Sequence, residues 1–583
     1  MAYTIFNRIA RLTTATLVGS ICLSSVALSQ SSLAEPRGSD DRIASTAASP
    51  RIRVEGSDAV DVFVNGNYVG KAPDASTRLA ADIALIGGDN IIALRAQRGR
   101  SASPFVLAEL LGPFGRIGSG SSWKALAAPG GDLNDAHGSW TSLGFNDDSW
   151  SLAQVGNAPL PSTTLHAGPA HPIWSSNGHD NTVLFRLKVY LPANLQADRP
   201  VGFGAHVTGG AGGEVVEVTT PEQLAYQLCR SKDHAGKCND DLPRTITFSG
   251  TIDYRNSVGM RAVSACVVKQ CTAPAKSVYI DGRLGACEGK ASQTMLIDAA
   301  GVTPLLVGSN KTVQGLGRHA NIKGRGLTLR GGVSNIVVRN LAITDINPAM
   351  VWGGDALTLD DVDRVWIDHN YFARIGRQMI VSGFGKASNV TVSWNEFDGV
   401  TDYSATCDNK HYWVMLDLGA ADTISFVDNF VHDTAGRMPH AGGMKGATVA
   451  MQIANNYFKH ISGHAADPQT QLVKLLIEGN YYDQVTTPIQ IDVTKPGYAF
   501  APVAGIAAVA SAISVNSQQL CDNALHRHCQ NNIAAPMPMH SGFPLDAEVL
   551  STLRRTSTAL IEPFPADRVP TLVPLLAGPG HIH

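Results

Sequence analysis

The chain has 583 residues, which is enough for two or more domains, because a single hydrophobic core stops growing well below that length. The formal net charge is −3 and only 16% of the residues are charged. This composition argues against a nucleic-acid-binding protein, which needs a basic face to neutralise phosphates. The 57 glycines favour turn-rich β-structure instead.

Residues 1–34 are typical of a secretory signal peptide. Arg8 and Arg11 precede an apolar run, and small residues that suit a cleavage site follow in "ALSQ" and "SLAEP". A membrane anchor is the alternative, but serine and threonine dilute the apolar run and a polar linker follows at 35–50. We expect a secreted protein that has no membrane attachment once the signal is cleaved.

Removal of the signal removes Cys22 and leaves eight cysteines. An even number in an exported chain predicts disulfides, although the sequence alone selects no pairing. A zinc site is disfavoured because the chain has no C-x-x-C pair and no matching histidine spacing.

Residues 51–200 show short alternating β-prone runs, and Asn65-Gly66 between two of them predicts a hairpin. The segment resembles the galactose-binding-like β-sandwiches attached to many carbohydrate-active enzymes, notably in "FNDDSWSLA". Its four tryptophans suit either sugar stacking or core packing, and we expect core packing. The prediction is an accessory β-sandwich domain with no assigned binding residues. The tryptophans are Trp123, Trp140, Trp150 and Trp174.

The second region contains a repeat in which an asparagine follows a short β-branched or aromatic run and precedes bulky residues. The intervals are 24 to 34 residues, which is typical of a parallel β-helix. Asparagines at equivalent corners of stacked coils can form a ladder of side-chain amides. We therefore predict an all-β chain in which the sandwich precedes a right-handed parallel β-helix at 201–583. The longest interval predicts a protruding loop. The repeated residues are Asn340, Asn370, Asn395, Asn429, Asn456 and Asn480.

Several acidic residues of the repeat region carry alternative interpretations. They could be calcium ligands, the acid and base of a glycosidase, or turn-stabilising groups, and the last is favoured for any one of them. His369 is interpreted as a framework residue. Between Asp368 and Glu396 the only charged side chains are cationic. The acids are Asp355, Asp360, Asp361, Asp363 and Asp368, and the cations are Arg374, Arg377 and Lys386.

Residues from about 201 to 530 resemble the pectin lyases of polysaccharide lyase family 1, in the pectate lyase superfamily. The string "VWIDH" is shared across that superfamily, whereas "ARIGRQ", "DYSATC" with "HYW", and "GRMP" resemble the pectin lyase branch. "GFGAHVTGG", "LAITDINPAMVWGGDALTLDD" and "CDNALHRHC" support the same resemblance.

The resemblance implies roles for five residues. Arg437 matches the proposed catalytic base, Arg377 matches the arginine that stands where pectate lyases hold calcium, and Asp355 matches the acidic residue of the cleft. Trp352 and Trp413 match two substrate-binding aromatic residues. The chain departs from the pattern where further tryptophans are expected near Cys266–Cys287, and Leu416 replaces a second aromatic residue after "HYW".

The resemblance also implies three disulfides. They join Cys266 to Cys287, Cys271 to Cys407 and Cys521 to Cys529. The remaining Cys229 and Cys238 would then form a local bridge that has no family precedent.

The chemistry of lytic cleavage explains the arginines. Removal of the proton next to the carboxyl group develops negative charge on that group, and a free carboxylate would then need a divalent cation. For a methyl ester, one fixed positive charge can suffice to stabilise the intermediate. An arginine supplies that charge together with several N–H donors. The residues thus predict metal independence, with calcium not expected and no cofactor.

Arg437 poses a problem as a base, because a guanidinium has an ordinary pKa of roughly 12.5–13.8. A nearby cation such as Arg377 and partial burial would lower its pKa, and Asp355 would oppose this. Arg437 could instead stabilise the enolate while another group accepts the proton, or it could be a structural partner of Asp433 or Asp355.

The expected protein is a monomeric, endo-acting pectin lyase that acts on methyl-esterified homogalacturonan and leaves unsaturated ends. Two alternatives stay open from the sequence. One is a calcium-dependent pectate lyase, and the other is a non-catalytic solenoid that binds pectin or attaches to surfaces.

Overall fold

A computed structural model of the chain describes residues 49–99, 101–130, 133–156, 168–192, 195, 198–271, 278–280, 285–491, 498–503, 516–537, 542–556 and 559–582. The expected signal peptide at 1–34 and nearly all of the expected linker at 35–50 lie outside these residues. The predicted division into 51–200 and 201–583 stays a prediction.

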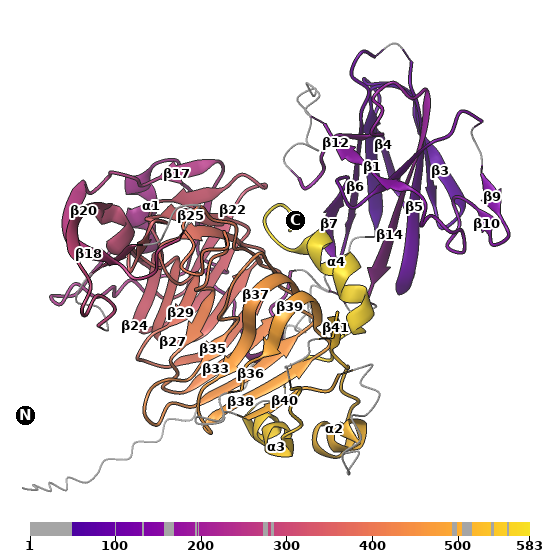
Figure 1. Cartoon of the computed structure of the whole chain (residues 1–583). Helices are drawn as coiled ribbons and strands as arrows, with labels where there is room; N and C mark the ends of the chain where they lie inside the picture. The colour runs from indigo at the N-terminus through magenta and orange to yellow at the C-terminus, as the bar shows by residue number, and fades with distance from the viewer. Residues whose placement is uncertain are drawn as a thin grey trace, which may run out of the picture. The chain divides into compact units, whose positions relative to one another are not determined.

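The first part of the chain forms a β-sandwich of two antiparallel sheets (Figure 1). One sheet contains β1 (Arg51–Gly56), β4 (Leu79–Asp82), β6 (Val106–Gly112), β7 (Gly115–Gly118), β12 (Gln154–Val155) and β13 (Ile173–Trp174). The other contains β2 (Val60–Val64), β3 (Asn67–Ala72), β5 (Gly88–Gln97), β8 (Lys124–Ala127), β11 (Ser151–Leu152) and β14 (Thr182–Leu191), and β9 (Asn134–Asp135) pairs separately with β10 (Gly138–Ser139). Asn65 and Gly66 join β2 to β3 with positive φ angles, which confirms the predicted hairpin.

The four tryptophans of the sandwich are core residues. Trp123 and Trp174 pack among the apolar side chains of the two sheets, and Trp140 and Trp150 stack on each other with ring centroids 6.5 Å apart. All four are at most 6% exposed, so none of them presents a ring face for a sugar. This confirms the interpretation as core packing.

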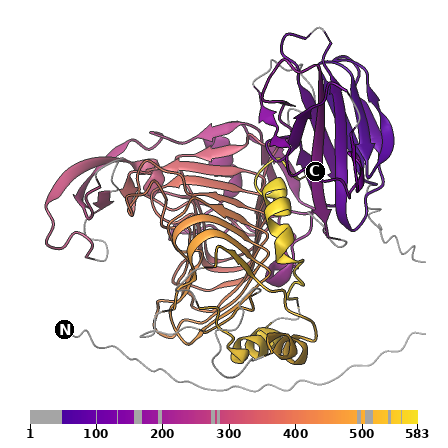
Figure 2. The same ribbon diagram turned by 45° about the vertical axis from the view of Figure 1, so that its right-hand side comes forward.

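The second part of the chain is a solenoid of parallel strands, whose stacked coils are seen from two directions in Figures 1 and 2. Its strands are β15 (Glu214–Glu217), β16 (Arg244–Phe248), β17 (Thr251–Asp253), β21 (Leu305–Leu306), β22 (Lys311–Gly315), β23 (Asn321–Lys323), β24 (Leu327–Arg339), β25 (Ala342–Ile346), β27 (Leu357–Asp368), β28 (Tyr371–Ile375), β29 (Ile380–Ser382), β30 (Ala387–Ser393), β31 (Glu396–Asp398), β32 (Met415–Asp417), β33 (Asp422–Val427), β34 (Phe430–His432), β35 (His440–Ala441), β36 (Val449–Ala454), β37 (Tyr457–Pro468), β38 (Val473–Glu478), β39 (Tyr481–Ile489), β40 (Tyr498–Phe500) and β41 (Ile533–Ala535). This confirms the predicted parallel β-helix.

Successive coils pair in register and form three rows of strands. Row 1 contains the first part of β27 with β29, β32, β35 and the end of β37, row 2 contains the second part of β27 with β30, β33, β36 and β38, and row 3 contains β28, β31, β34, the start of β37 and β39. Equivalent apolar side chains stack inside, as Phe372 and Phe397 do with centroids 5.2 Å apart. The turns from row 3 to row 1, which we call the 3–1 turns, therefore also stack on one another.

An asparagine ladder runs along the turns between row 2 and row 3. In each step the Nδ2–H of one asparagine donates to Oδ1 of the next over 2.9 to 3.0 Å, and the backbone N–H donates to the same oxygen. The members are buried, so each one satisfies groups that water cannot reach. They are Asn370, Asn395, Asn429, Asn456, Asn480 and Asn532.

The predicted asparagine ladder was wrong at Asn340 and missed Asn532. Asn340 comes directly after β24 and adopts φ 57°, so it occupies the position that His369 holds in the next coil. Its Nδ2–H donates to the carbonyls of Gly315 and Gly317, and Leu341 stands opposite Asn370. Asn532 was missed because it lies 52 residues beyond Asn480.

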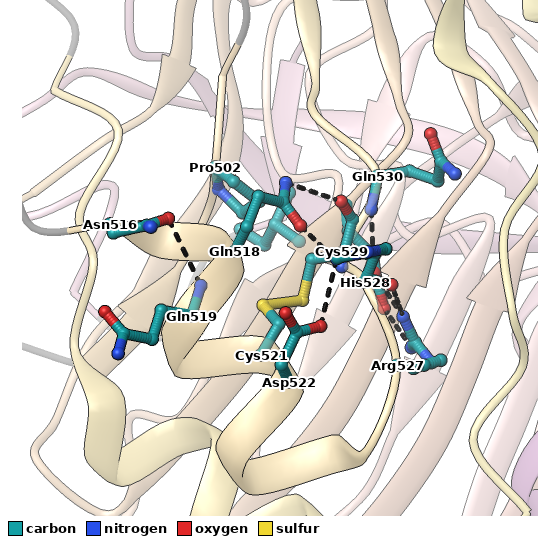
Figure 3. The surroundings of a disulfide bond; sticks show 12 residues. Pro502, Asn516, Gln518, Gln519, Cys521, Asp522, Arg527, His528, Cys529 and Gln530 are labelled. Carbon is teal, nitrogen blue, oxygen red and sulfur yellow. Dashed lines mark hydrogen bonds and ion pairs between the residues drawn. A yellow bond between two sulfur atoms is a disulfide. The ribbon is translucent and has the colours of Figure 1, made fainter.

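Helices close the later coils of the solenoid. α2 (Ser517–Leu525) and α3 (Ala547–Thr556) pack together through an apolar cluster that includes Leu476 and Phe500. Figure 3 shows the Cys521–Cys529 disulfide at α2, with both amide atoms of Gln518 bonded to the backbone of Cys529. Such a cap shields the last coil from solvent.

The other helices are short. α1 (Pro221–Leu228) begins after the capping residue Thr220 and buries Leu224 and Leu228 in the core of the solenoid. α4 (Val569–Leu576) packs in the same apolar cluster as the sandwich residues. No helix in the described ranges combines the length and the apolar character needed to cross a bilayer. The 3₁₀ turns are η2 (Gly202–Gly204), η3 (Ala299–Val302) and η4 (Ala566–Arg568).

Two carboxyl groups lie buried at the start of row 2 and the end of β32. Neither oxygen of Asp417 has a hydrogen-bond partner among the described residues, and burial raises the pKa of Asp417 well above its ordinary value. Burial also raises the pKa of Asp422 to about 6, although the Ser382 hydroxyl and the Ala387 N–H, which both donate to it, oppose this. Both groups are therefore protonated in the folded protein at pH values where an unfolded carboxyl is ionised.

This burial predicts that the folded protein loses stability as the pH rises from about 4 to about 6. In that window the unfolded state has released the proton of Asp422 and the folded state still holds it, so the free energy of unfolding falls, by up to roughly 3 kcal/mol for this group. We expect Asp422→Asn to flatten the decline. The measurement is urea unfolding at several pH values, with the exposed Asp148→Asn as a matched control. An Asp422→Asn variant that declines as steeply as the wild type would contradict the prediction.

Candidate active site

All five of the predicted site residues lie on the 3–1 turns. Trp352 and Asp355 precede β27, Arg377 precedes β29, Trp413 precedes β32 and Arg437 precedes β35. Because row 1 strands pair in register, as Leu357 does with Ile380 and Ile380 with Met415, these turns lie against one another. The solenoid thus brings together residues that lie far apart in the sequence. The ladder corner that carries Asn370 is a different turn of the coil.

Arg377 lies on the face of Trp352. The guanidinium carbon is 3.5 Å from the centre of the indole ring, which is a close cation–π contact. Asp355 is close by, and its Oδ1 accepts a hydrogen bond from the Gln378 backbone N–H over 2.8 Å. Burial raises the pKa of Asp355, and the positive charge of Arg377 opposes that rise. The pair therefore presents one cation and one carboxyl group on adjoining turns.

Arg437 is a partly buried cation that forms no ion pair within the described part of the chain. It adopts φ 62°, its Nε is buried without a hydrogen-bond partner, and its guanidinium carbon lies 5.5 Å from the centre of the Tyr412 ring. Asp433 instead pairs with His432 and His460. The alternative in which Arg437 is a structural partner of Asp433 is therefore wrong. A partly buried cation that no described carboxylate neutralises can meet negative charge from outside the protein.

His411 ties the site turns together and was not predicted. Its Nε2–H donates to the carbonyl oxygens of Arg377, at 2.7 Å, and of Trp413, at 3.0 Å, while its own carbonyl accepts the N–H of Ala435. Burial lowers the pKa of His411 to about 4, so the ring is neutral near pH 7. It holds the turns that carry Arg377, Trp413 and Arg437 at one spacing.

Tyr279 and Tyr412 complete the candidate site, and neither was predicted as a site residue. The Tyr412 ring meets the Trp413 ring edge-on with centroids 5.5 Å apart. Tyr279 meets Trp413 from another direction, with centroids 6.0 Å apart. Trp413 is 8% exposed, so it supports the two tyrosines more than it presents its own ring. Burial and the nearby Tyr412 raise the pKa of Tyr279, which keeps its phenol protonated and able to donate.

Tyr279 reaches the site on a small antiparallel excursion from the solenoid. The excursion contains β18 (Met260–Val267), β19 (Val278–Ile280) and β20 (Ser292–Asp298), and β19 pairs with β26 (Met350–Val351), which places Tyr279 opposite Val351 beside Trp352. This segment lacks the expected tryptophans, but it supplies one aromatic residue, Tyr279, that contacts Trp413. No regular pattern in the sequence marks Tyr279, because it lies outside the repeat.

Disulfides secure this excursion and the neighbouring loop. Cys266–Cys287 closes the excursion, and Cys271–Cys407 joins it to the loop between β31 and β32, which is the predicted protruding loop. Cys229–Cys238 and Cys521–Cys529 are local bridges elsewhere. These four pairs are the ones that the resemblance and the remaining cysteines imply.

Asp368 and His369 belong to the framework. Asp368 is buried and accepts hydrogen bonds from His369 Nδ1 and from the Ser393 hydroxyl, at 2.8 Å each, and it pairs with Arg339. They stand at the end of row 2 next to the ladder, on a different turn from Arg377. This confirms the framework interpretation of "WIDH".

Two further aspartates of β27 are engaged separately. Asp360 accepts the N–H of Gly385, and Asp363 pairs with Arg364 and accepts from Asn389. In the ranges that the structure describes, no three His, Cys, Asp or Glu side chains gather as a metal-binding group. Beside Trp352, the Asp355 carboxyl group lies next to the Arg377 guanidinium, an arrangement that does not suit a divalent cation.

Comparison with known proteins places these residues in a family. A family model described as pectate lyase matches residues 258–501. The curated probable pectin lyase F-1 of Aspergillus terreus is 39% identical over 386 residues, which are 65% of this chain and 93% of that protein. Probable pectin lyase E of Aspergillus fumigatus is 36% identical over 391 residues, 66% of this chain and 95% of that protein. A solved pectate lyase of Bacillus sp. N165, in complex with trigalacturonate, aligns at 18% identity with a TM-score of 0.40, covering 66% of this chain and 100% of that chain.

Proposed function

Because the chain belongs to the pectin lyases, a branch of the pectate lyase superfamily, we propose that it cleaves methyl-esterified homogalacturonan by β-elimination without calcium. The observation that carries this proposal is the charge of the site, where Arg377 and Arg437 stand on stacked turns and the Asp355 carboxyl group lies beside Arg377. Such a site favours a neutral ester that becomes negative during the reaction.

The reaction removes the proton at C5 and expels the glycosidic oxygen at C4 of the same uronic residue. Negative charge develops on the ester carbonyl oxygen as the C5 proton leaves. Guanidinium groups stabilise that charge with fixed N–H donors, because they are already in place before the charge appears. Arg377 is held by Trp352, and the partly buried Arg437 forms no ion pair with a carboxylate of the described residues.

A calcium-bound mechanism does not suit these residues. A hard cation needs several oxygen ligands, and the guanidinium of Arg377 beside Asp355 repels a second positive charge. The free carboxylate of polygalacturonate, which would carry two negative charges in the intermediate, is therefore expected to be the poorer substrate.

Export and an endo-acting, monomeric enzyme belong to the same proposal. Four disulfides in one chain suit an oxidising compartment. The four tryptophan rings of the sandwich are buried. We therefore propose that the sandwich is an accessory domain that does not use these rings to bind carbohydrate.

The test is an assay for unsaturated products on highly methylated pectin and on polygalacturonate, each with and without a chelator. We expect strong ultraviolet absorbance from methylated pectin, unchanged by chelator, and much less from polygalacturonate. Activity on polygalacturonate that disappears with chelator and returns with calcium would favour a pectate lyase instead. An absence of product from either polymer would contradict the proposed activity altogether.

A further inference from the structure

A cavity lies on the outer face of row 2, where the later coils meet α3. Its volume is about 470 Å³, and volumes of about 300–1,000 Å³ are typical of small-molecule sites. Besides row 2 and α3, it is lined by the turns that join row 1 to row 2. The candidate active site lies on the 3–1 turns, so the cavity is a separate feature of the solenoid. Its principal lining residues are Thr423, Ala450, Lys474, Tyr498 and Glu548.

Four neighbouring strands form the floor of this cavity. Thr423 of β33 pairs with Ala450 of β36, and Ala450 pairs with Lys474 of β38. Lys474 pairs in turn with Tyr498 of β40, which extends row 2. The next residue in each strand belongs to the core of the solenoid, and successive side chains of a strand point to opposite faces. The four side chains therefore point outward, and the small side chain of Ala450 leaves space between Thr423 and Lys474.

Lys474 is a nearly buried cation that has hydrogen-bond donors to spare. Its side chain is 9% exposed, and its Nζ lies 3.6 Å from the centre of the Tyr498 ring. One N–H donates to the Gln471 carbonyl over 2.7 Å, and among the described residues this is the one hydrogen bond of the ammonium group. Glu548 Oε1 lies 3.6 Å from Nζ, and the Glu548 side chain is 58% exposed. An ammonium group carries further N–H donors, so Lys474 can still bind an anion.

The groups around Lys474 suit a ligand that carries hydroxyls as well as a charge. Oγ1 of Thr423 accepts a backbone N–H over 2.7 Å, and its own proton has no acceptor among the described residues. The Glu548 carboxylate accepts no hydrogen bond from the described part of the chain. Asp422 also borders the cavity, but its two oxygens already accept hydrogen bonds from the Ser382 hydroxyl and the Ala387 N–H. The cavity therefore combines an available cation with an available carboxylate and hydroxyl.

We propose that this cavity binds an unesterified uronate ring, with the ring's carboxylate on Lys474 and its hydroxyls on Glu548 and Thr423. An ammonium group and a carboxylate form a charge-assisted hydrogen bond, and a carboxylate such as that of Glu548 accepts the O–H of a sugar. A methyl ester carries no charge and forms the weaker bond. The choice of a uronate over other hydroxy acids rests on the proposed function.

The cavity and the candidate active site then bind different parts of one polymer. The site at Arg377 and Arg437 acts on esterified residues, whereas the cavity holds residues that have lost the ester. The protein thereby gains an attachment to partly de-esterified pectin that does not compete with its substrate.

The test is the binding of galacturonate and of its methyl ester to the whole protein, measured by saturation-transfer NMR of the ligand protons. We expect a Kd of about 1 mM for galacturonate, the affinity expected for a ligand of this size. The methyl ester should bind at least about tenfold more weakly, because it lacks the charge that pairs with Lys474. Lys474→Met should weaken the binding of galacturonate by a similar factor, and far-ultraviolet circular dichroism verifies its fold.

Three further variants locate the binding and serve as controls. Ala450→Leu fills the cavity and removes no charge, so it should abolish binding, and it replaces Lys474→Met if that variant does not fold. Lys232→Met is the matched control, because Lys232 is an exposed lysine that precedes β16, and it should bind galacturonate as the wild type does. Arg437→Ala should also bind galacturonate normally, because Arg437 is not among the described residues that line the cavity.

Binding of galacturonate that survives in a folded Lys474→Met or Ala450→Leu variant, or that disappears in Arg437→Ala, would overturn the inference. So would equal affinity for the methyl ester, or a wild type that binds neither compound. An active enzyme that gives any of these results refutes the cavity assignment alone. A wild type that binds galacturonate but releases no unsaturated product refutes the proposed function alone.

Discussion

Replacement of Arg437 by lysine is expected to lower kcat on methylated pectin by about 100- to 1,000-fold while leaving the folded structure intact. Lysine keeps the charge but loses the planar set of N–H donors and reaches less far. Because Arg437 pairs with no carboxylate of the described residues, its loss leaves none of them without an ion-pair partner. The measurement is the initial rate of ultraviolet-absorbing product over a range of pectin concentrations.

Arg364→Lys is the matched control for Arg437→Lys. Arg364 is an exposed arginine on β27 that pairs with Asp363, away from the 3–1 turns. The variant should retain wild-type kcat and KM. Equal activity of Arg437→Lys and the wild type would show that Arg437 does not stabilise the reacting ester, and the site assignment would then have to move to other residues.

Replacement of Asn429 by alanine is expected to lower the free energy of unfolding by about 3 kcal/mol or more. Oδ1 of Asn429 accepts both the backbone N–H and the Nδ2–H of Asn395, and its own amide donates to Asn456 and to the Val392 carbonyl. Truncation leaves these groups buried without partners. Urea unfolding followed by circular dichroism measures the change.

Asn531→Ala controls for the general effect of removing an asparagine. Asn531 is exposed, whereas its neighbour Asn532 is fully buried at the end of the ladder. The variant should stay within about 0.5 kcal/mol of the wild type. If Asn429→Ala proved equally mild, the ladder would be a consequence of coil stacking and not a source of stability.

The repeat was readable in the sequence because each coil buries the same positions. A β-branched run, an asparagine and a bulky residue recur wherever the chain turns from row 2 to row 3. The pattern failed at Asn340, which occupies the left-handed position held by His369 and Trp394 in the next two coils, one residue before the ladder position. It also failed at Asn532, where a long insertion hides the last step.

The candidate site could be proposed from the sequence only where a short string carried it. Arg377, Arg437 and Asp355 stand in strings that resemble a family, so they could be proposed as site residues without a structure. Tyr279 and His411 stand in no periodic position. His411 acts through backbone carbonyls, and no sequence pattern records which carbonyl lies opposite a ring nitrogen.

The sequence alone established the parallel solenoid and the arginine-rich character of the site, because both rest on local patterns and on residue type. The register between coils decided which side chains of different coils meet. It placed His440 beside Asp467, 27 residues away, and Tyr412 against both Arg437 and His464. Such pairings depend on how many residues each turn contains, because that number sets which residues of successive coils lie opposite each other. Only the folded structure shows which residues these are.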